Sequence, residues 1–402
     1  MVNMEQTLTA KTRRVLPYEL VLGQALPWTL YDEAGNLLLR EGYVIAQQRH
    51  LDALLIRGAY IREAITPDEL EEGLSSNDVV PAQPLPFSTE PVVPRCLKLL
   101  QNLERLHADL EEGDIRTDMR MLIQGMAHVI EQVCNDDPEA VLYVLHTNRA
   151  HGYLVHQQLL GAVLVELLAK QADVNPSLRT SWVCAALTRD IGMIDMRLGN
   201  NVDDSLLQQQ VREHPIYSVA MLTRMRVNDP VWLQVVREHQ ERCDGSGYPH
   251  HLLKDAICEG ARLLGVVDSY AAMVVPRSNR VARAPKFALQ AIYAEKDTAY
   301  DVQWVQRLVK ELTLYPPGSL VKLQTGDWAL LAARQNNPKA LQVWVVKAAS
   351  GALQRPAVPR STSDDGYALQ EAVVLEPAAL EGIDIQSLRL AQIESVARAS
   401  NT

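Results

Sequence analysis

The sequence predicts a mainly α-helical protein with a small α/β unit at its N-terminal end and a small β-rich extension at its C-terminal end. Between Cys96 and about Leu314, apolar residues recur at helical spacing almost without interruption. Hydrophobic residues make up 47% of the chain but aromatic residues only 5%. Leucine, valine and alanine must therefore fill the core, which suits packed helices better than a β-sandwich.

Residues 1–64 are predicted to form the small N-terminal α/β regulatory unit. Two apolar segments, residues 30–31 and 37–39, flank a turn that contains Gly35 and Asn36, as in a β-hairpin. Helical spacing then runs through residues 46–57 and ends at Gly58. Prolines cluster in residues 65–95 and predict a linker, because proline disfavours both helix interiors and central strands.

The helical domain is predicted to span residues 96–315. Within it, Asp229 is suited to cap a helix that has Pro230 at its first position. Residues 316–402 are predicted to form the C-terminal β-rich extension and tail, since short apolar segments alternate there with Gly-Asp and Asn-Asn-Pro turns. The segment STSDDG at 361–366 is expected to be disordered.

Charge and composition exclude some classes of function. The net charge of −10 repels phosphate backbones, so nucleic-acid binding is not expected. Five cysteines without a CxxC pair indicate a reduced, cytoplasmic chain. The densest apolar run, Leu159 to Ala169, is interrupted by Glu166 and falls short of the roughly 20 residues that a membrane helix needs.

The sharpest local motif is a loop with the sequence Asp244-Gly245-Ser246-Gly247-Tyr248-Pro249. Its glycines permit positive φ, and the proline stiffens its exit. His239 lies shortly upstream, at the end of a predicted helix, and Asp268 lies on the next helix. Such a loop between two potential metal ligands is a candidate functional site.

With this loop, the chain resembles the HD-GYP family, the branch of HD-domain phosphohydrolases that cleave cyclic di-GMP. The similar segments are AALTRDIGM, REHPIYSVAML, HQERCDGSGYP, GARLLGVVDSYAAM and PRSNR. The resemblance covers residues 96–315 and implies a helical HD-domain-like bundle. It also implies a metal centre that activates water to attack a phosphodiester.

Carried over position by position, the resemblance implies both a set of metal ligands and a nucleotide site. The metal-ligand positions correspond to His156, Asp190, His214, His239 and Asp268, with His151 as the alternative to His156. Asp190 would also be the catalytic bridging aspartate. Arg277 and Arg280 correspond to the positions that contact nucleotide, and the loop residues Asp244, Gly245, Gly247, Tyr248 and Pro249 to a partner-binding loop.

Several positions depart from the pattern of the family. Arg189 replaces the histidine of the HD pair, Met193 a lysine, Gln240 the second of two histidines, and Gly152 a glutamate. An arginine has no acceptor atom and does not ligate metal. At ~4 Å and an effective dielectric of about 20, two unit charges interact by roughly 4 kcal/mol, and a dication is repelled more strongly. We therefore expect an incomplete metal centre, with one divalent transition metal, iron or manganese, or none.

These departures leave the enzymatic activity open. The favoured interpretation is a degenerate HD-GYP protein in cyclic di-GMP signalling that binds nucleotide or protein. Its expected partner is cyclic di-GMP or a GGDEF-type diguanylate cyclase, and a homodimer is a further expectation. The alternatives are a weak metal-dependent cyclic di-GMP phosphodiesterase and a structural adaptor without a small ligand. Arg189 is expected to pair with Asp190 or Asp268 in place of a metal ion, or else to extend to solvent.

Overall fold

The computed structural model describes residues 11–15, 26, 28–32, 37–45, 54, 59–63, 90–116, 118–194, 204–277, 280–331, 333 and 340–374. The chain divides into two compact units, Met1–Ser88 and Thr89–Thr402. Most of the predicted linker (65–89 of 65–95), the turn of the predicted hairpin and almost all of the predicted N-terminal helix lie outside the described residues.

The first unit contains an antiparallel sheet with the strand order β1-β4-β2-β3. Its strands are β1 (Lys11–Arg14), β2 (Leu30–Tyr31), β3 (Leu37–Leu39) and β4 (Tyr60–Glu63). The pairing of β2 with β3 is the one predicted from the two apolar segments. Leu30, Ile45 and Ile61 are buried in a small core that belongs to this unit alone.

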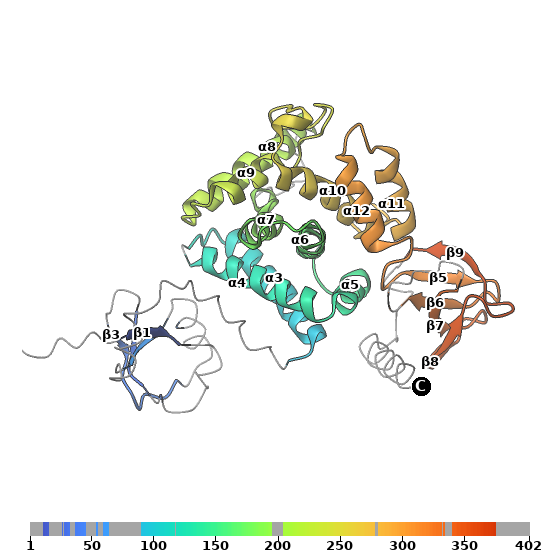
Figure 1. The fold of residues 1–402 in the computed structure, drawn as a ribbon, viewed down its shortest axis with the longest axis horizontal. Helices are drawn as coiled ribbons and strands as arrows, with labels where there is room; N and C mark the ends of the chain where they lie inside the picture. Colours follow the sequence, from blue (N-terminus) through green and yellow to red (C-terminus); the bar gives the residue numbers. More distant parts are fainter. Residues whose placement is uncertain are drawn as a thin grey trace, which may run out of the picture. The chain divides into compact units, whose positions relative to one another are not determined.

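The second unit is mainly helical, with a sheet at its C-terminal end (Figure 1). A mostly helical fold with small sheets toward both ends confirms the predicted fold class. The described helical segments are α3 (Val92–Glu111), α4 (Met119–Asp136), α5 (Pro138–Thr147), α6 (Tyr153–Gln171), α7 (Pro176–Thr188), η2 (Ile191–Met193), α8 (Asp204–Arg224), α9 (Pro230–Glu238), η3 (Lys254–Ala256), α10 (Glu259–Val274), α11 (Pro285–Ala294) and α12 (Val302–Leu312).

Several of these helices begin where an Asx residue precedes proline. Asp137 accepts a hydrogen bond from the Ala140 amide, and Asp229 accepts from the Val231 and Trp232 amides. Both caps satisfy first-turn N–H groups, and the following proline lacks an N–H that would need a partner. The start of α9 at Pro230 is therefore the one that the sequence predicted.

Helix α6 lies in the middle of the helical domain, packed against α3, α4, α7 and α10 (Figure 1). Residues 155–169 are buried on every side of the helix. Glu166 is buried with them, and burial raises the pKa of this carboxyl to about 7 although it pairs with Arg179. The Leu159–Ala169 run thus lies inside the helical core.

The C-terminal sheet is antiparallel, with the strand order β8-β7-β6-β5-β9. Its strands are β5 (Leu320–Leu323), β6 (Trp328–Leu331), β7 (Gln342–Lys347), β8 (Leu353–Ser361) and β9 (Leu369–Val373). Leu320 and Leu330 pack with Tyr143 of α5, which attaches the sheet to the helices. The segment 361–366 was expected to be disordered, but it forms a turn in which the Asp364 amide donates to the Ser361 carbonyl.

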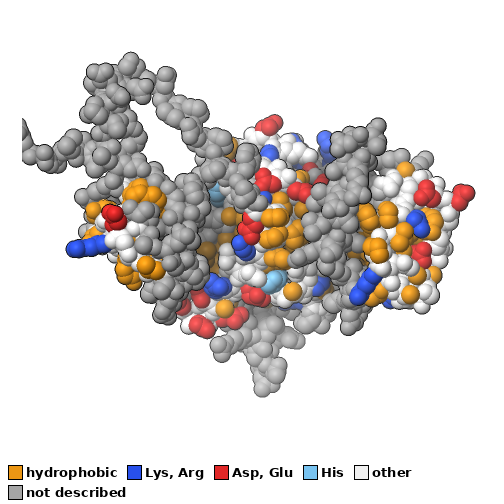
Figure 2. Space-filling view, turned by 90° about the horizontal axis from the view of Figure 1, so that it is seen from below, with side chains coloured by type: hydrophobic (Ala, Val, Ile, Leu, Met, Phe, Trp, Pro, Cys, Tyr) orange, Lys and Arg blue, Asp and Glu red, His pale blue; other side chains and the backbone are white. Residues whose placement is uncertain are grey.

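Acidic and basic side chains are intermixed on the face of the molecule that Figure 2 presents, with apolar groups between them. Of the helices in the described ranges, none combines the length and the apolar character that crossing a membrane requires.

Candidate functional site

The candidate site is formed by three side chains from separate elements, Asp190, His214 and His239. Asp190 lies between α7 and η2, His214 lies within α8, and His239 ends α9. Gly192 lets η2 approach α8, because a Cβ at that position would lie 2.6 Å from the Ser218 backbone nitrogen. All three side chains are buried.

Backbone carbonyls fix both imidazole rings. His214 Nδ1 lies 2.6 Å from the Val211 carbonyl, and His239 Nδ1 lies 2.7 Å from the Val236 carbonyl. A carbonyl only accepts, so each Nδ1 must carry the proton and each Nε2 presents its lone pair in the neutral ring. Ligating histidines in metal sites are commonly held in this way.

The Nε2 atoms of the two histidines lie close to each other and to a carboxylate oxygen. His214 Nε2 lies 3.2 Å from His239 Nε2 and 3.2 Å from Asp190 Oδ1, while His239 Nε2 lies 3.6 Å from the same oxygen. With neutral rings, three acceptor atoms face one another within 4.8 Å. This donor set fits one divalent transition metal of the imidazole- and carboxylate-binding kind. When bound, such an ion polarises a phosphoryl oxygen and lowers the pKa of a coordinated water.

Asp190 is held in its ionised form, which is the form that binds a cation. Burial alone raises the pKa of this carboxyl, but its charged surroundings, above all the Arg189 guanidinium, outweigh that effect. The pKa of Asp190 is therefore well below its ordinary value, and the group is a carboxylate at neutral pH.

Arg189 occupies the remaining half of the site. Its side chain is fully buried, and its Nε and one terminal nitrogen both lie 2.8 Å from Asp268 Oδ1. Nε is also 3.2 Å from Asp190 Oδ2, and the other terminal nitrogen donates to the Ala186 carbonyl. The expected pairing of Arg189 with the two aspartates is present. Both of its contacts with Asp268 go to one carboxylate oxygen, so this pair is not bidentate. Extension of Arg189 to solvent is excluded.

A glycine makes room for this guanidinium. Gly161 lies in α6, and a Cβ there would be 3.1 Å from the nearer terminal nitrogen of Arg189. Glycine within a helix costs about 1 kcal/mol relative to alanine. The glycine at this position therefore leaves the space that the buried guanidinium of Arg189 needs.

The sequence-based assignment of His156 is corrected by the structure. His156 Nε2 donates to the Leu145 carbonyl at 2.5 Å, away from the Asp190 group. The next residue, Gln157, faces the site from α6 and donates to Asp268 Oδ1 at 2.8 Å. The alternative candidate, His151, pairs with Glu104 at the surface. Neither histidine therefore joins the candidate metal group.

Asp268 is also placed differently from the expectation. It lies near Asp190 but is engaged by Arg189 and Gln157, so its Oδ1 already accepts hydrogen bonds from two residues. A second metal ion at this position would need the guanidinium to leave. The described residues thus fit a single-ion site and do not fit a two-metal centre.

The loop 244–249 packs its tyrosine toward the site. Tyr248 lies edge-on to His214, with ring centroids 6.2 Å apart. Burial raises the pKa of the Tyr248 hydroxyl, and the negative charge of Asp190 adds to this effect. Gly247 is required for the close approach, because a Cβ there would lie 2.3 Å from the Arg242 backbone nitrogen.

The remaining loop residues lie nearer the surface. Asp244 is exposed and accepts hydrogen bonds from the amide and hydroxyl of Ser246, while Gly245 has a φ of 78°. Tyr248 and Pro249 are joined by a cis peptide bond. Gln240 holds the loop through its backbone, since its carbonyl accepts from the Tyr248 amide at 3.2 Å.

The two predicted nucleotide-binding arginines lie at the surface beside Tyr153. Arg277 and Arg280 are exposed and exchange backbone hydrogen bonds. The Arg277 guanidinium lies 5.3 Å from the centre of the Tyr153 ring, and Arg280 donates to the Ala272 carbonyl. Burial raises the pKa of Tyr153, and the charges of Asp268 and Asp190 act on the same hydroxyl. Tyr153 is therefore close both to the arginines and to the buried carboxylates.

Three residues that organise the site were not identified from the sequence: Gln157, Gly161 and Glu241. Glu241 is buried and accepts from the amides of His250 and Leu252 at the end of the loop. A charged residue next to the predicted helix end at His239 was the available signal. Met193, at the position of the family's lysine, lies in η2 and offers no charge.

Comparison with known proteins gives the family. The model of the HD domain matches residues 139–303. The cyclic di-GMP phosphodiesterase PA4108 of Pseudomonas aeruginosa is 27% identical over 253 residues, which cover 60% of this chain and 59% of that protein. The 3'3'-cGAMP-specific phosphodiesterase 3 of Vibrio cholerae is 27% identical over 165 residues, 39% of this chain and 34% of that protein.

This chain thus spans about three-fifths of the length of the first of these relatives and about a third of the second. Among solved structures, Bd1817, a HDG"Y"P protein from Bdellovibrio bacteriovorus, aligns with a TM-score of 0.45 at 15% identity, covering 75% of this chain and 99% of that chain. The HD-domain match, the sequence relatives and the Gly247-Tyr248-Pro249 segment together show that this chain is a member of the HD-GYP family.

Proposed function

We propose that this protein acts in cyclic di-GMP signalling as a binding module whose metal centre is incomplete. The observation that carries the proposal is the buried guanidinium of Arg189, which holds Asp268 and Asp190 where a second metal ion would need them. The similarity to PA4108, a cyclic di-GMP phosphodiesterase, supports this nucleotide as the ligand.

Electrostatics supports recognition without efficient cleavage. The charges of Asp190, Asp268 and Arg189 sum to one negative charge, which one divalent ion at Asp190, His214 and His239 would reverse. Two-ion clamps stabilise the attacking and leaving oxygens together. A single ion beside a guanidinium that is already paired supplies only part of that stabilisation, so we expect slow turnover.

The surface around Tyr153 supports nucleotide contact. Arg277 and Arg280 are exposed guanidinium groups, which recognise phosphate by paired hydrogen bonds. The Arg277 guanidinium lies over the Tyr153 ring, and the charges of the buried carboxylates act on the hydroxyl of the same tyrosine. A cyclic dinucleotide bound there would place a phosphate between the arginines and the single-ion site.

The exposed side of the loop 244–249 is the proposed contact for a GGDEF-type diguanylate cyclase. Asp244, Ser246 and His250 are exposed, whereas Tyr248 is turned inward against His214. Occupancy of the buried site would therefore be transmitted to the outer face of the loop through Tyr248. Loops on a rigid scaffold are frequent recognition surfaces.

A weak metal-dependent phosphodiesterase is the second candidate. The lone pairs of His214 and His239 favour it, because they converge with Asp190 in the arrangement of a metal site. One ion can polarise a phosphoryl oxygen without a second.

The deciding experiment combines metal binding, nucleotide binding and turnover on the full chain. Manganese should raise the melting temperature of the wild type and of His156→Gln, but not of His214→Ala. In calorimetric titrations, cyclic di-GMP should bind, and the double variant Arg277→Gln/Arg280→Gln should bind about tenfold or more weakly, because charge-assisted hydrogen bonds are lost. Arg237→Gln, an exposed arginine of α9, is the matched control.

Hydrolysis of cyclic di-GMP is then followed with added manganese or iron. Binding with slow or no turnover supports the binding module. Rapid turnover would overturn it in favour of an enzyme, and absence of binding would leave the structural adaptor.

A further inference from the structure

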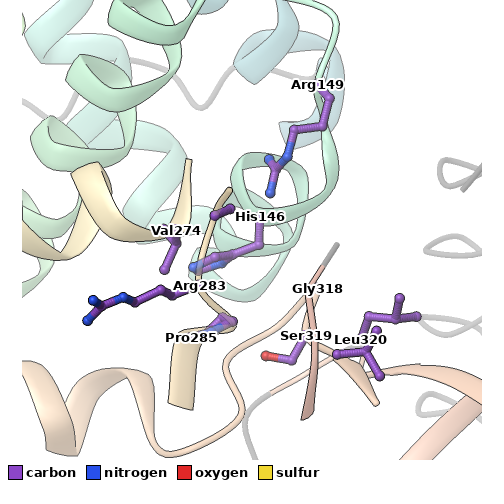
Figure 3. Close-up of a pocket in the computed structure, with 10 residues that line it drawn as sticks. His146, Arg149, Val274, Arg283, Pro285, Gly318, Ser319 and Leu320 are labelled. Atoms are coloured by element: carbon purple, nitrogen blue, oxygen red, sulfur yellow. The ribbon is translucent and has the colours of Figure 1, made fainter. Parts of the chain in front are cut away.

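A second cluster of polar groups lies away from the Asp190 site, in a cavity where α5, α11 and the C-terminal sheet meet. The cavity is narrow and partly open to solvent. Figure 3 shows Arg149 entering from the segment after α5, with its guanidinium directed toward His146, and Ser319 approaching from the opposite wall. Arg283 also lines the cavity, but its guanidinium points away in this view.

Arg149 is a largely buried cation without an acidic partner in the described part of the chain. One terminal nitrogen of its guanidinium donates to the carbonyls of Asn148 (2.7 Å) and Leu145 (3.4 Å). Its Nε is buried and has no partner. Burial lowers the pKa of this guanidinium to about 10, which reports the cost of holding the charge there.

The groups around Arg149 do not compensate its charge. Burial lowers the pKa of His146 to about 3 and that of His156 to about 4, so both imidazoles are neutral at neutral pH. Burial raises the pKa of Tyr270, whose hydroxyl contacts His146, so that group is neutral as well. A buried cation among neutral groups is expected to attract an anion.

The opposite wall offers a donor. Ser319 is 3% exposed, and its Oγ has no hydrogen-bond partner. In Figure 3 this hydroxyl is directed toward the cavity. Buried hydroxyls are normally bonded, so a ligand or a water molecule is expected there.

The start of α11 adds positive potential. Pro285 is the first residue of this ten-residue helix and lines the cavity. The N-cap residue Ala284 provides no capping side chain, and the first turn carries no acidic residue. An uncapped helix N-terminus favours an anion.

From these features together we propose that the cavity lined by Arg149, Ser319 and Pro285 binds a tetrahedral oxyanion of the phosphate type. The anion pairs with the guanidinium of Arg149 and accepts a hydrogen bond from the Ser319 hydroxyl. It thereby joins the segment after α5 to the residue that precedes β5. The proposal is independent of cyclic di-GMP binding at the Asp190 site.

The test uses the full chain, stripped of metal with a chelator and kept free of phosphate. Inorganic phosphate is the probe, with chloride at matched ionic strength as the reference and guanosine monophosphate as a second arm. Binding is measured by calorimetry and by hydrogen exchange of residues 316–320. Phosphate should bind and slow exchange in this segment. Stronger binding of the monophosphate would assign the site to a nucleotide phosphate, and equal or weaker binding to the free ion.

Variants then locate the site. Arg149→Gln should weaken phosphate binding about tenfold, and Ser319→Ala roughly fivefold, in line with the loss of a charge-assisted and a neutral hydrogen bond. Arg149→Lys keeps the charge and should retain part of the affinity, which guards against a glutamine variant that does not fold. The exposed Arg224→Gln is the control. Binding of cyclic di-GMP should be unchanged in all four variants.

Two results would overturn the proposal. One is an effect of phosphate no larger than that of chloride. The other is phosphate affinity that is unchanged in both Arg149→Gln and Ser319→Ala, with only the melting temperature of Arg149→Gln lowered. Arg149 would then serve only to bind the carbonyls at the C-terminal end of α5.

Discussion

At the scale of single residues, the properties of the site depend on a buried guanidinium and the two carboxylates that it binds. Arg189 is fully buried, and the negative charges of Asp268 and Asp190 raise its pKa against the effect of burial. A buried ion pair adds little stability over an apolar replacement, but removal of one partner leaves an uncompensated charge. The stability of Arg189 variants therefore shows whether the ion pair of Arg189 with Asp268 and Asp190 supports the fold.

We predict that Arg189→Met lowers the free energy of unfolding by about 3–5 kcal/mol, the range for breaking a buried pair. The reason is that Asp268 and Asp190 would then be buried beside an apolar side chain. Urea denaturation measures the change. The double variant Arg189→Met/Asp268→Asn should recover much of the loss, and a melting temperature that Arg189→Met leaves unaltered would disprove the structural role.

His156 gives a prediction about acid stability. Burial and the charge of Arg149 lower its pKa to about 4, against 6.5 for an ordinary histidine, although the hydrogen bond with Leu145 acts the other way. Because the folded-state pKa is the lower one, the unfolded chain takes up the proton first as the pH falls. The stability that neutral His156 contributes is thus present above about pH 6.5 and is lost between that pH and about 4.

Each such proton changes the free energy of unfolding by up to about 1.4 kcal/mol per pH unit. We predict that His156→Gln shows a shallower loss of stability than the wild type between pH 6 and 4.5, by close to one proton. Chemical denaturation at several pH values gives both slopes. His146 titrates in the same direction and remains in both proteins. Identical slopes would show that His156 is not buried as a neutral group.

At the scale of elements, α6 shows where sequence reasoning succeeded and where it failed. The length and apolar content of the helix were readable because residues 155–169 are almost all suited to burial. For the same reason, the hydrophobic pattern has no preferred face and does not fix which residue turns toward the site. Neighbouring helical residues point about 100° apart, since a turn has 3.6 residues. His156 was assigned by its resemblance to a family position, whereas Gln157 is the residue whose side chain reaches Asp268.

The structure brings the histidines of α8 and α9 together with Asp190, and the sequence had singled out both by their resemblance to family positions. His214 precedes Pro215 within α8, and His239 follows a helix whose start was marked by Asp229 and Pro230. The closeness of Gly161 to Arg189 was not readable, because it depends on how α6 and α7 pack and not on either sequence segment alone.

Gly161 yields a prediction for the packing of these helices. Glycine to alanine in a helix normally stabilises by up to about 1 kcal/mol. We expect that gain for Gly125→Ala in α4, since no atom lies within 4 Å of the added Cβ. Gly161→Ala should give no gain or a loss, because its Cβ would lie 3.1 Å from the guanidinium of Arg189. Thermal denaturation compares the two variants.

The same substitution in the background of Arg189→Met is the control for this explanation. With the guanidinium gone, Gly161→Ala should stabilise as Gly125→Ala does. A Gly161→Ala variant that is as stabilising as Gly125→Ala in the presence of Arg189 would show that the contact does not constrain the helix.

At the scale of the whole molecule, the described residues form separate hydrophobic cores. The core of the first unit contains Leu30, Ile45 and Ile61 and includes no residue of the helical domain. The main helical core runs from Cys96 to Leu312. The helices and the C-terminal sheet meet at Tyr143, Leu320 and Leu330, and so belong to one compact unit.

Separate cores predict separate unfolding transitions. Leu30→Ala removes a fully buried side chain from the first unit, and Leu164→Ala removes one from the centre of the helical core. Each should lower the stability of its own unit by about 2–5 kcal/mol, the usual cost of such a truncation. In calorimetry of the full chain, each substitution should shift one transition and leave the other in place.

A fragment of residues 89–402 completes this test. It should fold, show the transition that Leu164→Ala shifts, and bind manganese with the affinity of the full chain, because Asp190, His214 and His239 all belong to the second unit. A fragment that unfolds more easily than the full chain, or a Leu30→Ala variant that shifts both transitions together, would show that the first unit supports the helical domain. Since the two cores share no side chain, independent transitions are the result that packing predicts.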